Sequence, residues 1–248
     1  KDEYTQRIEN AVSCFREVND LSDIEIVNLA RNDQLDIAID LNGHSKGNRI
    51  SIFSYRVAPI QINYLGYPGT TGSDYFDYII ADKVIIPEEN KNFYTEKVLY
   101  LPNSCIPHDH KTDISNNKFS REELGLPLDG FVFTCFNEIK KITRKEFRIW
   151  IRLLQKVDQS VLWLIKPHHL AMKNIFSEAT NHGIDQKRIV FAEKINLLDH
   201  ISRHSCADLF LDTFNFNAAT TASIALSSGM PIITLRGKSY CARTAASI

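Results

Sequence analysis

The sequence predicts an α/β protein whose strands form doubly wound parallel sheets in two lobes. From residue 119 onward, short apolar runs alternate with amphipathic segments that carry helix-start and helix-stop residues. Short apolar runs are typical of strands buried on both faces, and their alternation with helices indicates βαβ units. The 248 residues, 44% of them hydrophobic, are enough for two separate cores. We expect one lobe over residues 1–110 and a second over residues 111–248, with a boundary in the polar stretch Ser104–Lys118.

The second lobe has the more regular pattern. Apolar runs predict its strands at Gly130–Cys135, Val161–Ile165, Arg188–Phe191 and Ala207–Asp212, with another starting at Pro231. Ser120–Glu123 and Thr143–Glu146 read as capping boxes, and the second opens a helix with apolar residues at helical spacing. Further helices are predicted at Ala171–His182 and around Leu198–Ser205.

The first lobe follows the same class with weaker signals. Ser22–Glu25 is a capping box for a helix that ends near Arg31. Strands are predicted at Leu35–Leu41, Ile60–Leu65 and Tyr78–Ala81. Turn-rich loops, Asn42–Gly47 and Gly66–Gly72, follow the first two strands. These loops are therefore expected at the carboxyl edge of a parallel sheet.

Composition excludes several classes of function. Lys and Arg number 29 against 30 for Asp and Glu, so no overall positive field favours nucleic acid or an anionic membrane. No apolar run approaches the ~18 residues of a membrane span, and no signal peptide is visible. The five scattered cysteines are expected to be small core residues in a reducing compartment, which favours a cytoplasmic protein. Because the chain lacks an initial Met and ends within a predicted helix, we expect an internal piece of a longer protein.

The segment Ala207–Leu235 carries the strongest functional signal. An apolar strand leads into a polar loop, and Thr220 and Thr221 then open a helix that Gly229 ends. A helix start at the carboxyl edge of a parallel sheet presents free N–H groups, which suit an anion such as a nucleotide diphosphate. The alternative interpretation is that the two threonines only cap the helix.

Eight ordered motifs resemble one protein family. They are Asp40–Gly47, Ala58–Gly72, Asp77–Asp82, Tyr94–Lys97 with Leu101–Pro102, Val161–Leu164, Ala207–Thr213, Ala218–Ser223 and Ala242–Ser247. Together they resemble the catalytic region of the O-linked N-acetylglucosamine transferase family, including its bacterial and Spindly-type members. The match covers nearly the whole chain from about Asp36.

The resemblance implies a fold and an activity. The fold is GT-B, in which two Rossmann-like lobes face a cleft, with the N-terminal lobe incomplete and the C-terminal lobe truncated in this chain. The activity is inverting, metal-independent transfer of a sugar, GlcNAc or a related one, from a nucleotide diphosphate sugar, expected to be a UDP-sugar, to Ser or Thr of proteins. No other cofactor is implied, and tetratricopeptide repeats commonly precede this region and present the protein substrate.

The resemblance also assigns residues of the second lobe to the nucleotide sugar. Lys141 matches the lysine that meets the phosphates, with Lys140 as its adjacent competitor, and Asn137 precedes both on the same loop. Thr220 and Thr221 supply amides and hydroxyls to the leaving diphosphate. His200 matches a histidine that donates to a phosphate or stacks beneath the base. The alternatives are a solvated lysine and a histidine on a helix surface.

In the first lobe, the resemblance places two loops on the sugar and acceptor side of the site. His44 is assigned a catalytic role in positioning or proton handling, and an Asx-type turn is the alternative. Gly66 and Gly69 are expected to be turn glycines that let the backbone approach a ligand. The remaining residues assigned to this part of the site are Ser45, Leu65, Pro68 and Thr70. His108–His110 and Lys166–His169 could suggest a metal, but surface loops are favoured and no metal is predicted.

Departures from the family pattern gather at the nucleotide positions. Ala219 replaces a histidine, and Ile224 replaces an aspartate that accepts hydrogen bonds from the ribose, which costs about 1.5–3 kcal/mol in a buried site. Glu138 stands where an amide is common, and Ser227 where a tryptophan is usual. Two functions stay open: an active protein glycosyltransferase, and a catalytically impaired binding or scaffold protein of the same fold. A sugar-nucleotide epimerase is less favoured by the Asp40–Gly47 and Leu65–Gly72 motifs.

Overall fold

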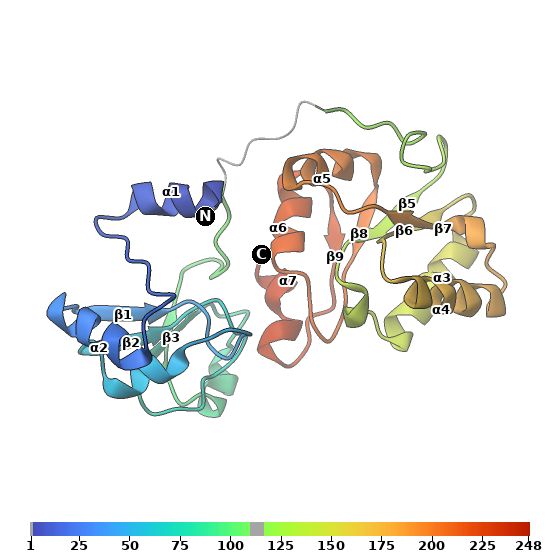
Figure 1. The fold of residues 1–248 in the computed structure, drawn as a ribbon. Coiled ribbons are helices and arrows are strands. Elements are labelled where there is room, and N and C mark those ends of the chain that lie inside the picture. Colours follow the sequence, from blue (N-terminus) through green and yellow to red (C-terminus); the bar gives the residue numbers. More distant parts are fainter. Residues whose placement is uncertain (1, 110–116) are drawn as a thin grey trace. The chain divides into compact units, whose positions relative to one another are not determined.

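The computed structural model describes residues 2–109 and 117–248, and it divides the chain into two compact units (Figure 1). Residues 1–80 and 92–99 form the first unit, and residues 81–91 and 100–248 form the second. Each unit carries a sheet with parallel strand pairs, as the α/β prediction requires. The lobe boundary expected near residue 110 stays a prediction.

The second unit contains a five-stranded sheet whose strand order reverses direction. Its strands are β5 (Val132–Cys135), β6 (Val161–Ile165), β7 (Ile189–Ala192), β8 (Leu209–Leu211) and β9 (Ile232–Ile233). Their order across the sheet is β7-β6-β5-β8-β9, and each neighbouring pair is parallel. The chain therefore builds the sheet outward from β5 in one direction and then returns to add β8 on the other side.

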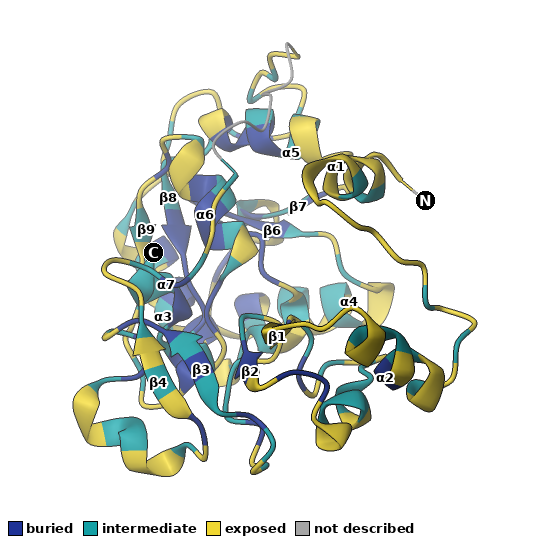
Figure 2. Ribbon diagram, turned by 90° about the vertical axis from the view of Figure 1, so that its left-hand side faces the viewer, coloured by how far each residue is buried: buried dark blue, intermediate teal, exposed yellow. Residues whose placement is uncertain are grey.

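Helices follow these strands and close a large core. They are α3 (Arg144–Lys156), α4 (His169–Asn181), α5 (Leu197–Arg203), α6 (Thr220–Ser227) and α7 (Thr244–Ser247), with the short 3-10 helices η3 (Ile139–Lys141), η4 (Gln186–Arg188), η5 (His204–Cys206) and η6 (Tyr240–Ala242). The central strands are buried on both faces, as Figure 2 shows for β6 and β8. Trp150 of α3 and Trp163 of β6 lie at the centre of this core, both at most 2% exposed.

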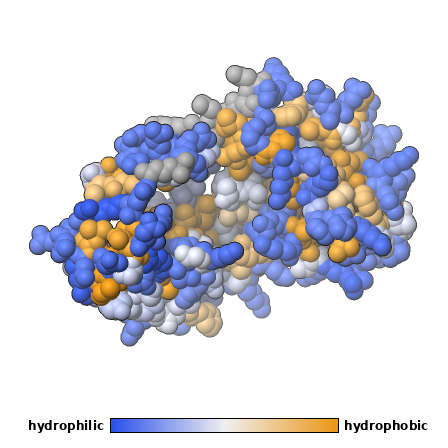
Figure 3. Space-filling model, in the orientation of Figure 1, coloured by the Kyte–Doolittle hydropathy of each residue, from blue (hydrophilic) through white to orange (hydrophobic). Residues whose placement is uncertain are grey.

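The first unit is smaller and more open. It contains α1 (Glu3–Ala11), α2 (Asp23–Asn32), the 3-10 helix η1 (Ile50–Tyr55) and most of a sheet with the strands β1 (Ile37–Asp40), β2 (Ile60–Asn63), β3 (Tyr78–Ala81) and β4 (Lys97–Tyr100), which pair in the order β1-β2-β3-β4. The 3-10 helix η2 (Glu88–Phe93) begins in the second unit and ends in the first. Alternate residues of β1 face solvent, and Ile37 and Ile39 are 51% and 48% exposed. Hydrophobic groups are accordingly visible among hydrophilic ones on this unit in Figure 3.

Most predicted elements form where the pattern placed them, and two were missed. The predicted strands Val161–Ile165 and Tyr78–Ala81 are β6 and β3 to the residue, and Ser22 and Glu25 make both bonds of a capping box at α2. The helix α1 and the strand β4 were not predicted. At Ser120 the capping hydrogen bonds with Glu123 form, but they close a series of turns rather than a helix.

The expectation that all five cysteines are core residues is wrong. Cys105, Cys135 and Cys206 are buried as expected, whereas Cys241 is only partly buried and Cys14 is exposed in the irregular segment between α1 and α2. Over the described part of the chain, every helix is too short or too polar to cross a membrane.

Candidate functional site

The carboxyl ends of β5 and β8 lie side by side at the point where the strand order reverses. In open α/β sheets this topological switch point leaves a crevice, because the connections from the two neighbouring strands run to opposite faces. Asn137 follows β5, and Asp212 begins the loop after β8. The sequence places polar residues at both positions, so this edge is where a ligand can meet directed side chains.

Asp212 determines the shape of the loop after β8. Its Oδ1 accepts hydrogen bonds from the backbone N–H groups of Thr213 at 2.8 Å and Ala218 at 2.7 Å, which ties the two ends of the loop together. Its Oδ2 accepts from Thr234 Oγ1 at 2.7 Å. Burial raises the pKa of this carboxyl, and the hydrogen bonds partly offset that rise. The sequence identified Asp212 as the end of a strand and part of the Ala207–Thr213 motif but gave it no role, although a carboxylate at a strand end was the available signal.

Asn137 connects the two strands through its amide. Its Nδ2 donates to Thr213 Oγ1 at 2.8 Å and to Asp212 Oδ1 at 3.1 Å, and its Oδ1 accepts from Thr221 Oγ1 at 2.7 Å. The residue is 1% exposed, so these bonds satisfy an amide that burial would otherwise penalise. The structure thus brings together two predicted site residues, Asn137 and Thr221, in direct contact.

The predicted helix start is confirmed, and the capping interpretation of the threonines is wrong. The helix α6 begins at Thr220, its N-cap is Ala219, and the cap makes no side-chain hydrogen bond. Thr220 and Thr221 are therefore the first two helical residues, and the first-turn N–H groups lack a side-chain cap from Ala219. Gly229 ends the segment with φ of +78°, as its predicted stop role requires.

The two adjacent lysines have different surroundings. Lys140 is exposed and pairs with Glu138 at 2.5 Å. Lys141 is partly buried, with its Nζ donating to the Asn217 carbonyl oxygen at 3.3 Å and lying 4.2 Å from the centre of the Phe216 ring. Burial lowers the pKa of Lys141, and the nearby Asp212 carboxylate opposes that effect. Lys141 therefore faces the loop after β8, while Lys140 neutralises the unusual carboxylate of Glu138.

His200 lines a cavity of about 650 Å³ at the same edge of the sheet, together with Phe136, Ile165 and Lys194. Its Nδ1 accepts from the guanidinium of Arg203 at 2.7 Å, and its ring lies 5.0 Å from that of Phe136. An arginine has no acceptor, so the neutral imidazole must carry its proton on Nε2. Burial lowers the pKa of His200 to about 3, so the ring is neutral at pH 7.

Arg203 was missed by the sequence analysis, although its spacing was a usable signal. It lies three residues after His200, on the same side of α5, and is 2% exposed. Its Nη1 donates to the Glu193 carbonyl oxygen at 2.6 Å, and its guanidinium lies 5.0 Å from the Phe136 ring centre. Burial lowers its pKa to about 10. The side chain orients the imidazole of His200.

Glu146 corrects another prediction. Thr143 is the N-cap of α3 but makes no side-chain cap bond, so the predicted capping box does not form. Glu146 is instead fully buried, and its Oε1 accepts from the backbone N–H of Phe214 at 2.9 Å. The capping pattern was misleading because Glu146 also lies four residues before Trp150, on the buried face of the helix. Through this hydrogen bond, Glu146 anchors the loop after β8.

In the first unit, His44 is exposed and bonded to a neighbouring loop. Its Nε2 lies 2.8 Å from the Thr71 carbonyl oxygen, and its ring packs edge-on against Tyr67 at 5.3 Å. The Asx-type turn in this loop belongs to Asp40, whose oxygens accept from the N–H groups of Asn42 and Gly43 at 3.0 Å. The Asx-turn interpretation of His44 is therefore wrong.

The loop containing Leu65 and Gly66 packs tightly against the strand end of β1. Gly66 has no room for a side chain, because a Cβ there would lie 2.1 Å from the Leu41 carbonyl oxygen. Ser45 Oγ donates to the Gly66 carbonyl oxygen at 3.3 Å, and Leu65 adopts φ of +69°. The glycine permits an approach of two backbones, whereas its expected approach to a ligand stays a prediction.

Thr70 and the turn at Pro68 and Gly69 are held by a residue that the sequence analysis missed. Glu96 is 3% exposed, and its oxygens accept from Thr70 Oγ1, Thr71 Oγ1 and the Thr71 N–H, each at 2.6 Å. Burial raises the pKa of Glu96, but these hydrogen bonds outweigh it and the pKa is lowered. The available signal was the Tyr94–Lys97 motif, which places Glu96 before β4.

The described residues bring no three His, Cys, Asp or Glu side chains together as metal ligands. His110, part of one cluster considered for a metal, lies outside the described residues. In the other cluster, the rings of His168 and His169 lie 4.1 Å apart on the exposed start of α4.

A doubly wound sheet with polar side chains and a helix start at its switch point is the arrangement in which open α/β proteins bind ligands. The chain belongs to glycosyl transferase family 41, whose model matches residues 2–119 and 115–248. Its fold is that of the GT-B glycosyltransferases, because it superposes on a mutant of the Thermobaculum terrenum O-GlcNAc transferase with a TM-score of 0.87. That match has 26% identity and covers 100% of this chain and 47% of the other.

Curated relatives carry related names. The chain is 35% identical to the Arabidopsis thaliana protein called a probable UDP-N-acetylglucosamine–peptide N-acetylglucosaminyltransferase SEC, over 99% of this chain and 26% of that protein. It is 26% identical to the Caenorhabditis elegans UDP-N-acetylglucosamine–peptide N-acetylglucosaminyltransferase, over 87% of this chain and 28% of that protein. The chain thus spans about a quarter of the length of these relatives. Anabaena HepE, solved with UDP and glucose, shares the fold alone, with a TM-score of 0.54, 14% identity and coverage of 94% and 70% of the two chains.

Proposed function

We propose that this chain is the catalytic part of a protein glycosyltransferase that moves a GlcNAc-like sugar from a UDP-sugar to Ser or Thr, with inversion and without a metal. The names of the relatives support the reaction. The observation that carries the proposal is the hydrogen-bonded connection of Thr221, Asn137 and Asp212 across the switch point. We place this enzyme in the cytoplasm and expect a protein acceptor, with no nucleic acid partner.

The leaving diphosphate is assigned to the start of α6. Transfer without a metal needs other hydrogen-bond donors near the growing charge of the leaving group. The first-turn N–H groups of α6, at Thr220 and Thr221, can supply them together with the Thr220 hydroxyl, whereas the Thr221 hydroxyl already donates to Asn137. Lys141 adds a cationic amine to these donors. Its amine lies close to them because it bonds to the loop that leads into this helix. Asp212 and Glu146 fix that loop, so these donors are positioned before the ligand arrives.

His200 is assigned to the nucleotide through its protonated Nε2. Arg203 occupies Nδ1, so the imidazole offers an N–H donor or a flat face to the cavity beside Phe136. A neutral ring avoids placing a charge in a partly buried position, which the lowered pKa reflects.

His44 is assigned to the acceptor side by the chemistry of its ring. The Thr71 carbonyl can only accept, so Nε2 of His44 donates to it and the neutral ring keeps Nδ1 as an acceptor. A free Nδ1 can take the proton of an attacking hydroxyl, as inverting transfer requires. Ser45, Leu65, Gly66, Pro68, Gly69 and Thr70 shape the adjacent loop.

Calorimetric titration of the full-length protein with UDP and with GDP tests the donor site. UDP is expected to bind, and Lys141→Ala should weaken that binding at least tenfold, which corresponds to about 1.4 kcal/mol. The matched control is Lys140→Ala, whose amine is taken up by Glu138 and whose loss should change the affinity less than threefold. The proposal would be contradicted if neither UDP nor GDP binds at millimolar concentration.

A binding or scaffold protein without turnover is the second candidate. Two observations favour it: Ala219 makes no side-chain bond at the cap of α6, and Ile224 is an apolar, partly buried residue one turn into that helix. Restoring both positions, Ala219→His with Ile224→Asp, is expected to raise nucleotide affinity at least tenfold if this loss limits the protein. Sugar transfer to a Ser-containing peptide by the unaltered protein would eliminate this candidate.

A further inference from the structure

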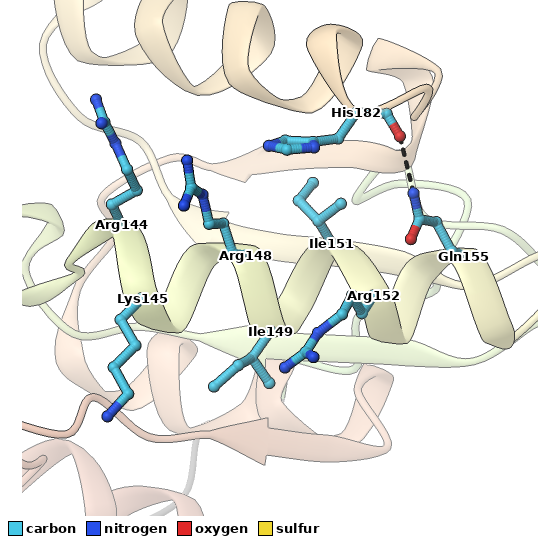
Figure 4. Close-up of a pocket in the computed structure, with 8 residues that line it drawn as sticks. All are labelled: Arg144, Lys145, Arg148, Ile149, Ile151, Arg152, Gln155 and His182. Atoms are coloured by element: carbon cyan, nitrogen blue, oxygen red, sulfur yellow. Dashed lines mark hydrogen bonds between the residues drawn. The ribbon is translucent and has the colours of Figure 1, made fainter.

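A basic groove lies along α3, outside the proposed nucleotide site. The cavity has a volume of about 800 Å³, and its lining includes Arg144, Lys145, Arg148 and Arg152 of α3. Figure 4 shows Arg144 and Arg148 extending from the side of the helix where His182 lies and Lys145 and Ile149 extending from the other side. Arg152 leaves the helix between these two sides and extends toward Ile149. Gln155 Nε2 donates to the His182 carbonyl oxygen at 2.9 Å and closes one end of the groove.

The four cations of this basic groove are poorly compensated. Glu178 is the one carboxylate that the described residues bring within ion-pair distance, at 3.8 Å from Arg148 Nε, and it also meets His182 at 3.4 Å. Glu146, the acidic residue of α3, points into the core and bonds to Phe214. The whole chain carries a formal charge of −1, so this concentration of positive charge is local.

The arrangement also works against the stability of its own helix. Arg144 and Lys145 occupy the first turn of α3, where the helix dipole favours negative charge. Arg144, Arg148 and Arg152 follow one another at four-residue spacing, which places like charges side by side. An anion in the basic groove would relieve both repulsions, whereas a helix selected for stability alone would carry acidic residues here.

The dimensions and chemistry of the basic groove favour an acidic peptide segment. Arg144 and Arg152 are eight residues apart, or about 12 Å along the helix, which an extended peptide of about four residues can follow. An arginine guanidinium binds a carboxylate through two parallel hydrogen bonds, and the partly buried Ile149 offers an apolar contact beside Arg152. The lining has no Phe, Tyr or Trp for stacking bases, which single-stranded nucleic acid requires.

We propose that the basic groove of α3 is a docking site for an acidic peptide segment, with Arg144, Arg148 and Arg152 as its main contacts. The inference goes beyond the proposed sugar transfer, because the groove takes a charged stretch of a partner protein whether or not a nucleotide is bound.

The experiment uses the full chain and a fluorescein-labelled hexaglutamate peptide, with fluorescence anisotropy measured at low and at physiological salt. We expect binding that weakens with salt, and no binding of the matched hexaglutamine peptide. The variant R144Q/R148Q/R152Q should bind hexaglutamate at least tenfold more weakly. The control variant K83Q/K187Q/K238Q removes the same charge from exposed positions elsewhere and should stay within twofold of the unaltered protein.

Folding of the variants is checked by thermal melting. Because the substitutions remove repulsion, R144Q/R148Q/R152Q should melt at or above the melting temperature of the unaltered protein. A second variant, R152E, should abolish peptide binding. Equal losses in the two triple variants would overturn the proposal, since attraction would then be nonspecific. Failure of hexaglutamate to bind, or tighter binding of a hexathymidine oligonucleotide, would overturn it as well. UDP titration separates this test from that of the proposed function, because the groove variants should retain their UDP affinity.

Discussion

The two sheets of this protein differ in strand order, and the difference locates the candidate functional site. The first sheet runs β1-β2-β3-β4 in chain order, with no reversal among its described strands. The second runs β7-β6-β5-β8-β9 and reverses between β5 and β8. Only a reversal opens a crevice at the carboxyl edge, because the connections then leave on opposite faces. The second sheet therefore carries the directed polar network of Asn137, Asp212 and Thr221.

In each unit a buried carboxylate holds a threonine-containing loop, but the hydrophobic packing around the two loops differs. Asp212 holds the loop after β8 above a large core, whereas Glu96 holds the Thr70–Thr71 turn in a unit where Ile37 and Ile39 are half exposed. We therefore expect defects in the loop after β8 to lower the stability of the whole second unit. Defects in the Thr70–Thr71 turn should act more locally.

Asp212→Ala should have the largest effect. It leaves the buried N–H groups of Thr213 and Ala218 without an acceptor and removes one of the two acceptors of the Asn137 amide, at a cost of about 3 kcal/mol. Both tryptophans of the chain lie in the second unit, so urea unfolding followed by their fluorescence measures this loss directly. The exposed Asp129→Ala is the control, with an expected change below about 0.5 kcal/mol.

Gly66→Ala tests the first unit. Its Cβ would lie 2.1 Å from the Leu41 carbonyl oxygen and 2.6 Å from Asn42 Cα, so the two loops must separate at a cost of about 2 kcal/mol. Hydrogen exchange should rise over residues 60–72 while tryptophan fluorescence unfolding stays unchanged. Gly69→Ala is the matched control, because its Cβ meets only the movable ring of Tyr67 at 3.1 Å. A shift in the tryptophan transition would show that the two units do not unfold separately.

Glu146 separates the role of an acceptor from that of a charge. Glu146→Ala takes the acceptor from the partly buried Phe214 N–H and should cost about 2 kcal/mol, with weaker UDP binding because the loop loses its anchor. Glu146→Gln keeps a carbonyl oxygen in place and should restore most of both. Equal losses of UDP affinity in the two variants would mean that the charge, not the anchor, matters.

Acid should weaken the second unit through the partly buried His200 and the buried His204. The pKa values of His200 and His204 are lowered to about 3 and about 4, chiefly by burial, so between these values and about pH 6.5 the unfolded chain binds more protons than the folded one. Stability therefore falls as the pH is lowered through this range, by up to about 1.4 kcal/mol per pH unit for each imidazole. His204→Gln should flatten this dependence in tryptophan-monitored unfolding, whereas the exposed His169→Gln should leave it unchanged.

Local patterns predicted most of the elements but not the contacts between them. Apolar runs located β6 and β3 to the residue, because burial on both faces requires an uninterrupted apolar strand. The strand β4 was missed because its residues alternate between exposed and half-buried positions without a strong apolar pattern. Glu146 was assigned to a cap because its spacing from Thr143 fits a capping box as well as the buried face of α3.

The sequence by itself determined the alternation of strands and helices, the helix start at Thr220 and the family motifs, because these depend on residues close together in the chain. Tertiary structure alone decided that Asn137 meets Asp212 and Thr221, that Lys141 rather than Lys140 faces their loop, and that Glu96 holds Thr70. These pairs lie far apart in the chain or differ only in which way a side chain points. Their contacts depend on strand order and burial, which no local pattern encodes.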